Sequence, residues 1–392
     1  MQRISELEKK YVLEALDYQF ATSTNSVFTS RLEKAFSSKF NSKYSINCAN
    51  GTATLHTALV ACGIKEGDEV IVPPLTMSSP AISVLQAGAT PIFADVDPKT
   101  FIISPDGIRK VITKKTRAIM TVSLYGLSPE YEEIKEICKE HDLYLIEDNA
   151  ECFLGKYKGK YVGEFGDFSS YSFQATKHMT SGEGGMLTTN DGALADAARK
   201  FTSLGYAGVS SSQGKITKSD IQDPNYIRHV TLGFNYRMSE VCSAVALGQL
   251  ERLEELVDAR VQTAKVYDEV FDKFGDVFTK QSAPEYMENS YWAYSVYLNE
   301  RFPKEDWYRF KEIYKEHQGQ GFYAAWKLSY QETLLKKFAE TGKTWQNYDE
   351  SICPIAEFLQ PRILQFKTDF WNIEDAKLEA SIIEKTIREF LL

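Results

Sequence analysis

The sequence predicts an α/β fold with a mostly parallel central sheet flanked by helices, because short apolar runs alternate with helical patterns between residues 44 and 190. The intervening stretches have the helical period, and several begin with Ser, Thr or Asp in the N-cap position. Ligands bind such sheets at the carboxyl ends of the strands. The strands are expected at residues 44–50, 69–74, 90–97, 117–126, 143–149, 167–173 and 185–191.

A long helical pattern after Ser239 marks the predicted boundary between two domains. It covers residues 241–274, which exceeds an ordinary globular helix, so we expect a kink or a connector. From about residue 275 the composition shifts to aromatic and charged residues. We therefore expect a large domain at 1–255, which includes an amphipathic N-terminal helix, and a connector helix with a smaller α+β domain at 256–392.

Charge and composition exclude several classes of partner. The 392 residues carry 45 basic and 54 acidic side chains, for a net charge of −9, without a basic run. A nucleic acid or an anionic membrane surface is therefore not the expected partner. No stretch reaches the roughly 20 apolar residues of a membrane span. Six scattered cysteines and five histidines without ligand spacing predict free thiols, a reducing cytoplasm and no metal site.

Lys177 is the first candidate for chemistry. It lies between two predicted strands, five residues after Ser172 and ahead of glycines 182, 184 and 185. A lysine desolvated beside the sheet would be nucleophilic enough to form an imine with an aldehyde. Taken alone, the segment is more typical of a surface lysine in a glycine-containing turn.

Asp148 and the Gly51–Thr52 pair supply two further elements. Asp148 ends an apolar strand at the sheet edge, where a carboxylate can keep the pyridine nitrogen of pyridoxal phosphate (PLP) protonated. Gly51 and Thr52 lie between a strand and a helix, which forms a cup for a phosphate. An N-cap and a plain turn are the ordinary alternatives. Asn235 and Arg237 could donate to a phosphate or carboxylate, or belong to a helix start capped by Ser239.

Taken together and in order, these segments resemble the DegT/DnrJ/StrS nucleotide-sugar aminotransferases, a family of fold type I PLP enzymes. The resemblance covers the chain to about residue 255. It is carried by G-T-A at 51–53, V-P-P-L-T at 72–76, E-D-N-A-E at 147–151, S-F-x-x-x-K at 172–177, G-E-G-G at 182–185 and N-Y-R-M at 235–238.

The resemblance implies a role for each matching residue. Lys177 would bind PLP covalently and move the proton to the substrate carbon, Asp148 would pair with the pyridinium nitrogen, and Glu151 would lie near the cofactor hydroxyl. Asn235 would reach the cofactor phosphate from the neighbouring subunit, which implies a homodimer. The other phosphate-binding residues would be Gly51, Thr52, Ala53 and Ser172.

The sequence departs from the family pattern at three places. Met77 stands where the family has an aromatic ring stacked on the cofactor, and is expected to contact it. Ser123 replaces the usual His or Asn. The stretch FYAAWKLSY at 322–330 replaces His-Tyr-x-Pro-Leu-His, which leaves the sugar open.

The implied reaction is transamination from L-glutamate to a 4-keto-6-deoxy hexose on a nucleotide, as in perosamine synthesis for surface polysaccharides. Candidate cations for the nucleotide are His229, Arg228, Arg237 and Lys327. Two alternatives stay open. One is a sugar dehydratase, although relatives of that kind have His at the lysine position. The other is a regulatory or binding relative without catalysis, which would have no need for Lys177, Asp148 and Ser172 together.

Overall fold

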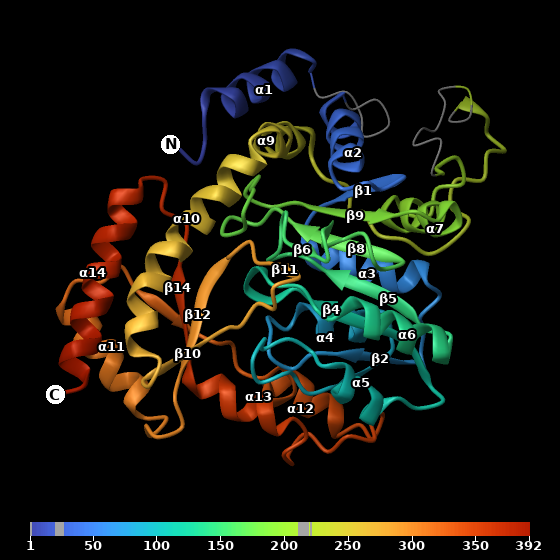
Figure 1. Cartoon of the computed structure of the whole chain (residues 1–392). Coiled ribbons are helices and arrows are strands. Elements are labelled where there is room, and N and C mark those ends of the chain that lie inside the picture. The colour runs from blue at the N-terminus through green and yellow to red at the C-terminus, as the bar shows by residue number, and fades with distance from the viewer. Residues whose placement is uncertain (1, 20–26, 211–218, 220–221) are drawn as a thin grey trace.

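The computed structural model describes residues 2–19, 27–210, 219 and 222–392 (Figure 1). At its centre is a seven-stranded sheet in the order β1-β9-β8-β5-β4-β2-β3. Strand β9 is antiparallel to both neighbours, and the other six strands share one direction. Each predicted apolar run supplies one strand, which confirms the mostly parallel sheet. The strands are β1 (Tyr44–Cys48), β2 (Glu69–Val72), β3 (Thr90–Phe93), β4 (Thr116–Val122), β5 (Tyr144–Asp148), β8 (Phe168–Ser172) and β9 (Gly185–Thr189).

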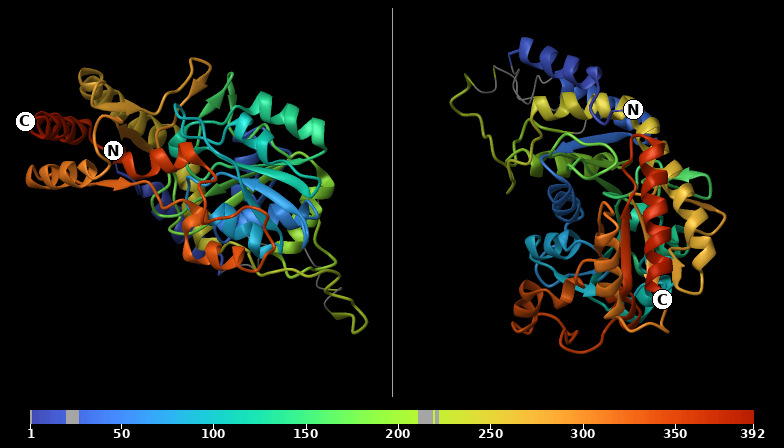
Figure 2. Two further views of the ribbon diagram at one scale, coloured as in Figure 1. Left: turned by 90° about the horizontal axis from the view of Figure 1, so that it is seen from below. Right: turned by 90° about the vertical axis from the view of Figure 1, so that its left-hand side faces the viewer.

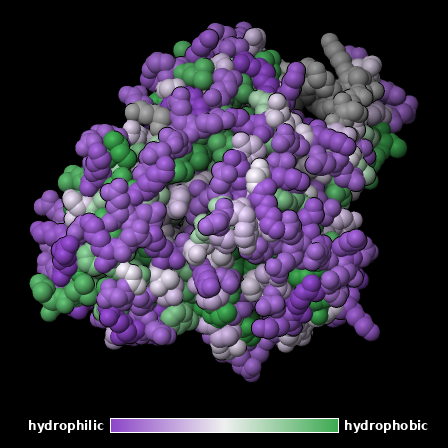
Figure 3. Space-filling view, viewed as in Figure 1, coloured by the Kyte–Doolittle hydropathy of each residue, from purple (hydrophilic) through white to green (hydrophobic). Residues whose placement is uncertain are grey.

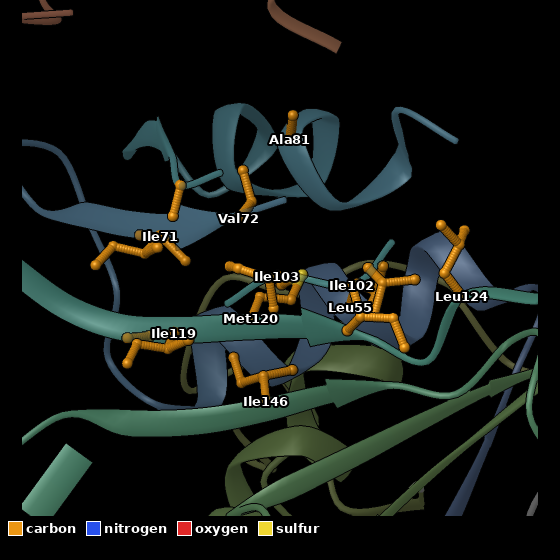
Figure 4. Packing of buried hydrophobic residues seen from close by; sticks show 14 of the residues in the cluster. Leu55, Ile71, Val72, Ala81, Ile102, Ile103, Ile119, Met120, Leu124 and Ile146 are labelled. Atoms are coloured by element: carbon orange, nitrogen blue, oxygen red, sulfur yellow. The ribbon is translucent and has the colours of Figure 1, made fainter. Parts of the chain in front are cut away.

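Helices cover both faces of this sheet. The chain crosses from β1 to β2 to β3 in one direction and returns through β4 to β5, so right-handed crossovers place the two helix pairs on opposite faces. Accordingly, α3 (Gly51–Ala61) contacts α4 (Ser79–Gln86) and α7 (Gly192–Thr202), whereas α5 (Pro105–Val111) contacts α6 (Tyr131–His141). Figure 4 shows Ile71 on β2, Ile119 on β4 and Ile146 on β5 inside this fully buried core.

The N-terminal helix packs on the start of the connector. A capping box of Ser5 and Glu8 begins α1 (Glu6–Asp17), which lies along α9 (Glu240–Glu251), as does α2 (Val27–Lys39). The long helical pattern breaks at Arg252, whose φ of −112° and ψ of 11° separate α9 from α10 (Leu253–Phe271). The expected kink is confirmed, and α10 leads into the small domain (Figure 1).

The small domain has a four-stranded antiparallel sheet in the order β10-β12-β14-β13. Its helices pack on one face around an aromatic core that includes Tyr294 and Phe366. Figure 2 shows α14 beside α10 at the edge of the molecule. The elements are β10 (Phe278–Lys280), β12 (Ala293–Leu298), α11 (Asp306–Glu316), β13 (Phe322–Ala324), β14 (Ile363–Lys367) and α14 (Ile373–Phe390).

One segment from the C-terminal part of the chain packs on the large sheet. It contains α12 (Thr333–Ala339) and α13 (Pro354–Leu359). The Gln346 side chain bonds both the N–H and the C=O of Phe93 at 2.8 Å, and the Tyr348 hydroxyl donates to the Pro91 carbonyl at 2.7 Å. The segment thereby covers the edge strand β3, whose backbone groups would otherwise be open.

A second small sheet joins β11 (Met287–Glu288), β6 (Lys156–Tyr157) and β7 (Lys160–Tyr161). It connects the loop after β5 to the chain just before β12. Across the described residues, no helix combines the length and the apolar character needed to cross a membrane.

Candidate active site

A cavity of about 960 Å³ opens at the carboxyl ends of the parallel strands, between the large sheet and the small domain. Such a volume suits a cofactor or a substrate of moderate size. Seven residues predicted to bind the cofactor line it together with Lys177: Gly51, Thr52, Ala53, Met77, Asp148, Glu151 and Ser172. The structure thus brings together residues that are up to 126 positions apart in the sequence.

Lys177 lies in the loop between β8 and β9, with its side chain in the cavity. Its Nζ donates to Glu151 Oε1 at 3.0 Å and lies 4.5 Å from the centroid of the Trp292 ring. The two charged side chains are 13% and 4% exposed. The Lys177 amine is therefore held in place by one acidic and one aromatic neighbour and is shielded from most of the solvent. A lysine that binds a cofactor covalently requires such surroundings.

Asp148 ends β5 and is buried. Burial raises the pKa of its carboxyl to about 6, while the hydrogen bond from the Ala150 amide and the charge of Lys177 act in the opposite direction. An ionised carboxylate at such a position is costly without a cation beside it. The pyridinium nitrogen of PLP is a cation of this kind, so Asp148 fits the cofactor.

The first turn of α3 lies where the sequence predicts a phosphate cup. Asn50 caps the helix by accepting from the Ala53 amide at 2.8 Å. A Cβ on Gly51 would lie only 2.8 Å from Ser172 Cβ, so glycine lets the end of β8 touch the start of the helix. The helix N-terminus and the Ser172 hydroxyl therefore lie together, as binding of a phosphate requires. These residues fit the PLP phosphate.

Met77 lies beside this cup and is held there by Ser79, a residue that was not among the predicted site residues. Its Sδ accepts from the Ser79 amide at 3.1 Å and from the Ser79 hydroxyl at 3.0 Å. Ser79 also shares a hydrogen bond of 2.8 Å with the Thr52 hydroxyl. The exposed thioether thus lies at a fixed place in the cavity wall.

Five residues predicted to bind phosphate or substrate do not line this cavity. Asn235 is exposed and its backbone pairs with Ser203. His229 is exposed and bonds the Leu204 carbonyl through Nδ1 at 2.8 Å. Lys327 is exposed as well, and Arg237 has a buried Nη1 without a hydrogen-bond partner among the described residues. Arg228 is also exposed and absent from the cavity wall.

Ser123 has a packing role in this structure. It is fully buried, donates to Asn149 Oδ1 at 2.8 Å and shares a hydrogen bond of 3.3 Å with the Tyr131 hydroxyl. Neither Ser123 nor these two partners line the cavity.

The wall contributed by the small domain contains residues that sequence reasoning missed. Trp292 and Trp326 stack at 5.9 Å with 16° between their planes, and the buried Tyr125 ring lies parallel to both. Strand pairing sets Tyr323 opposite Gln365 and Ala293 opposite Lys367, so these side chains share one face of the sheet. The tryptophan in FYAAWKLSY is the sequence signal for this wall, whereas its neighbour Lys327, the predicted residue, lies outside the cavity.

Comparisons with known proteins assign the chain to a family. The family model of the DegT/DnrJ/EryC1/StrS aminotransferases matches residues 2–357. The GDP-perosamine synthase of Escherichia coli O157:H7 is 39% identical over 289 residues, which are 74% of each chain. That of Caulobacter vibrioides is 39% identical over 299 residues, 76% of each chain.

A solved structure shows the same fold over nearly the whole molecule. The aminotransferase from Psychrobacter cryohalolentis superposes with a TM-score of 0.87 at 28% identity, and the match covers 99% of this chain and 98% of the other. The family match, the relatives and the superposition all point to one family of enzymes. The chain therefore belongs to the DegT/DnrJ/EryC1/StrS aminotransferase family and is a PLP-dependent aminotransferase.

Proposed function

We propose that this enzyme transfers an amino group from L-glutamate to a keto-deoxy hexose carried on a nucleoside diphosphate. The observation that carries the proposal is the convergence on one cavity of the Lys177 amine, the buried Asp148 carboxylate and the N-terminus of α3. The relatives named GDP-perosamine synthase support a 4-keto-6-deoxy hexose as the acceptor. The product would be an amino sugar for surface polysaccharide.

Two sets of residues would hold the cofactor. Gly51, Thr52 and Ser172 would bind its phosphate, and Asp148 would keep a proton on its ring nitrogen. When bound, PLP supplies an electron sink for the carbon that carries the amino group. The Lys177 amine would take the proton from this carbon of the donor and deliver one to the sugar carbon. Glu151, which bonds Nζ, would keep that amine oriented between the two steps.

The acceptor would bind against the small-domain wall. Trp292 and Trp326 offer flat apolar faces next to Lys177, which suit a pyranose ring with a methyl group. Lys367 lines the same cavity and its Nζ lies over the Phe370 ring at 4.5 Å. The structure records no acidic partner for Lys367 among the described residues, so its charge is available to a diphosphate.

A homodimer with shared sites is part of the proposal. Apolar side chains stand exposed along 227–234, where Leu232 is 80% and Ile227 is 72% exposed, with Val230 and Phe234 between and beside them. Figure 3 shows apolar side chains gathered at the upper right, in the region of the chain between α7 and α9. Exposed apolar surface of this kind marks a protein interface. Asn235 follows directly and would enter the partner's cavity.

The cytoplasm is the proposed compartment. All six cysteines are free and five of them are buried, which suits a reducing environment. Nucleotide-linked sugars are the substrates expected there.

The reaction is tested by loading the enzyme with pyridoxamine phosphate and adding nucleotide-linked keto sugars one at a time. Return of the visible absorbance of the lysine-linked cofactor, with one amino sugar formed per cofactor, is the expected result. Lys177→Ala should abolish it, whereas Lys315→Ala, at an exposed lysine of α11, should not. With L-glutamate, 2-oxoglutarate should appear in step with the amino sugar. Deoxygenated sugar without 2-oxoglutarate would establish dehydration instead.

The shared site is tested by mixing two inactive variants. In a hybrid of Lys177→Ala with Asn235→Ala, one cavity regains an intact lysine and an intact asparagine if Asn235 acts across the interface. Activity should therefore return in the mixture. If mixing restores nothing although hybrids form, Asn235 acts in its own chain and the shared site is wrong.

A further inference from the structure

The loop that carries Lys177 is held through two consecutive backbone carbonyls. The Thr176 carbonyl accepts from Trp292 Nε1 at 3.0 Å and from Arg260 Nη2 at 3.2 Å. The Lys177 carbonyl accepts from Arg3 Nη2 at 2.8 Å, and the Lys177 amide donates to the Gln174 carbonyl at 3.0 Å. The backbone of the lysine is therefore fixed on both sides by groups from distant parts of the chain.

Arg260 forms the inner half of this arrangement. It lies on α10, is 2% exposed, and donates from Nη1 to the Trp292 carbonyl at 2.9 Å and to Thr368 Oγ1 at 3.0 Å. Burial lowers the pKa of its guanidinium to about 10. Arg260 thus ties together β12, the end of β14 and the lysine loop, and its removal would damage the fold as a whole.

Arg3 forms the outer half and is itself held on α9. Its carbonyl accepts from Gln249 Nε2 at 2.8 Å and from Arg252 Nη1 at 3.4 Å. Gln249 Oε1 in turn accepts from the Thr180 amide at 3.3 Å, so the loop and the N-terminal segment share this glutamine. Arg3 is half-buried and absent from the cavity wall, which separates it from the groups that touch substrate.

We propose that Arg3 is a positioning residue for Lys177. While Arg260 and Trp292 fix the carbonyl before the lysine, Arg3 fixes the carbonyl after it, so that the Cα–Cβ bond keeps one direction toward the cavity. The amine must reach first the cofactor and then the substrate carbon, and a displacement of about 1 Å at a reacting group can cost up to about 10²-fold in rate. The proposal rests on the proposed function of Lys177.

Arg3→Met tests the proposal with two measurements. Because a hydrogen bond from a charged group is lost, amide hydrogen exchange at 175–180 should become about tenfold faster or more. This rise should occur in the cofactor-free protein as well as in the loaded one. The kcat should fall about tenfold while KM for the acceptor is retained, and Arg3→Lys, which keeps the charge and a donor, should recover part of both effects.

Arg31→Met is the matched control. Arg31 lies on α2, pairs with Glu14 of α1 at 3.2 Å and contacts the Tyr11 and Phe28 rings, but it does not touch the loop. If exchange at 175–180 is the same in Arg3→Met, in this control and in the unchanged enzyme, the proposal is overturned. If exchange is faster in Arg3→Met but the unchanged protein transfers no amino group to any keto sugar, the contact of Arg3 with the loop is supported and the proposed function is rejected.

Discussion

Lys177 Nζ lies 3.0 Å from Glu151 Oε1, and the second oxygen of the same carboxylate accepts from the Tyr125 amide at 3.2 Å. Tyr125 has a φ of 61°, in the left-handed region that a bulky residue seldom adopts, and it is fully buried. A backbone conformation that costs about 1–3 kcal/mol persists where the surroundings enforce it. In this conformation the Tyr125 amide donates to the Glu151 carboxylate, which accepts from the Lys177 amine.

Glu151→Gln should therefore lower kcat about tenfold and change KM little. The amide retains the size and an acceptor, but the bond to Nζ loses the charge that makes such bonds about twice as strong. Steady-state kinetics with the acceptor sugar would measure the effect. Glu136→Gln, at an exposed position of α6, is the control and should leave kcat unchanged. An unaltered kcat in Glu151→Gln would show that the carboxylate charge is not required.

Gly51→Ala should weaken PLP binding by at least about tenfold. The new Cβ would lie 2.8 Å from Ser172 Cβ, so either the helix start or the strand end must move and the phosphate cup opens. Fluorescence titration of the cofactor-free protein with PLP would give the affinity. Gly275→Ala is the matched control, because a Cβ there meets nothing within 4 Å and the φ is −62°. Equal affinities in the two variants would contradict the proposed cup.

Asp148→Asn should change how the stability of the cofactor-free protein depends on pH. The carboxyl has a pKa raised by burial from its ordinary value of 3.8 to about 6, so between these pH values the folded chain holds a proton that the unfolded chain has lost. The free energy of unfolding should fall as pH rises through this window, by up to about 3 kcal/mol. Thermal unfolding at pH 4 to 7 should show this loss in the unchanged protein and not in Asp148→Asn.

Asp106→Asn provides the comparison for that measurement, since Asp106 is exposed at the start of α5. It should follow the unchanged protein at every pH. In the loaded enzyme, Asp148→Asn should also lower kcat by about 10²-fold or more, because an electrostatic group that faces the developing charge is removed. Parallel unfolding curves for Asp148→Asn and the unchanged protein would show that the carboxyl titrates normally.

Trp326→Ala should raise KM for the acceptor sugar about tenfold and leave the half-reaction with L-glutamate unaffected. The ring stacks on Trp292 at 5.9 Å, and its loss removes half of the apolar wall against which the sugar would lie. Rapid-scan spectroscopy separates the two half-reactions. The control is Trp345→Ala, at a tryptophan that is 54% exposed outside the cavity. A slower donor half-reaction with an unchanged acceptor KM would assign Trp326 to the donor instead.

Most strands and helices of the large domain could be predicted from the sequence, because the patterns that indicate them are local. The apolar runs became β1 to β5, β8 and β9, and Asp148 lies at a strand end as the run at 143–149 predicts. The long helical pattern at 241–274 breaks at Arg252. Such features depend on neighbouring residues, so one stretch of sequence is enough to predict them.

The contributions from the small domain could not be predicted in the same way. Trp292 lies beside Lys177 and stacks with Trp326 only because the antiparallel sheet brings together segments far apart in the sequence. Packing of Gln346 and Tyr348 on β3 likewise depends on tertiary contacts. Arg3 is a single cation near the start of the chain, and no local pattern connects it with residue 177.

Two hydrogen bonds to the Thr176 carbonyl limit how freely the small domain can be exchanged for that of a relative. Trp292 and Arg260 reach that carbonyl from outside the sheet that carries the lysine loop, and Trp292 also lines the wall against which the acceptor would bind. A chimera that imports a relative's small domain to change the sugar would therefore also exchange the support of the reactive amine. Grafting individual wall residues around a retained Trp292 and Arg260 is the route to altered selectivity that this architecture favours.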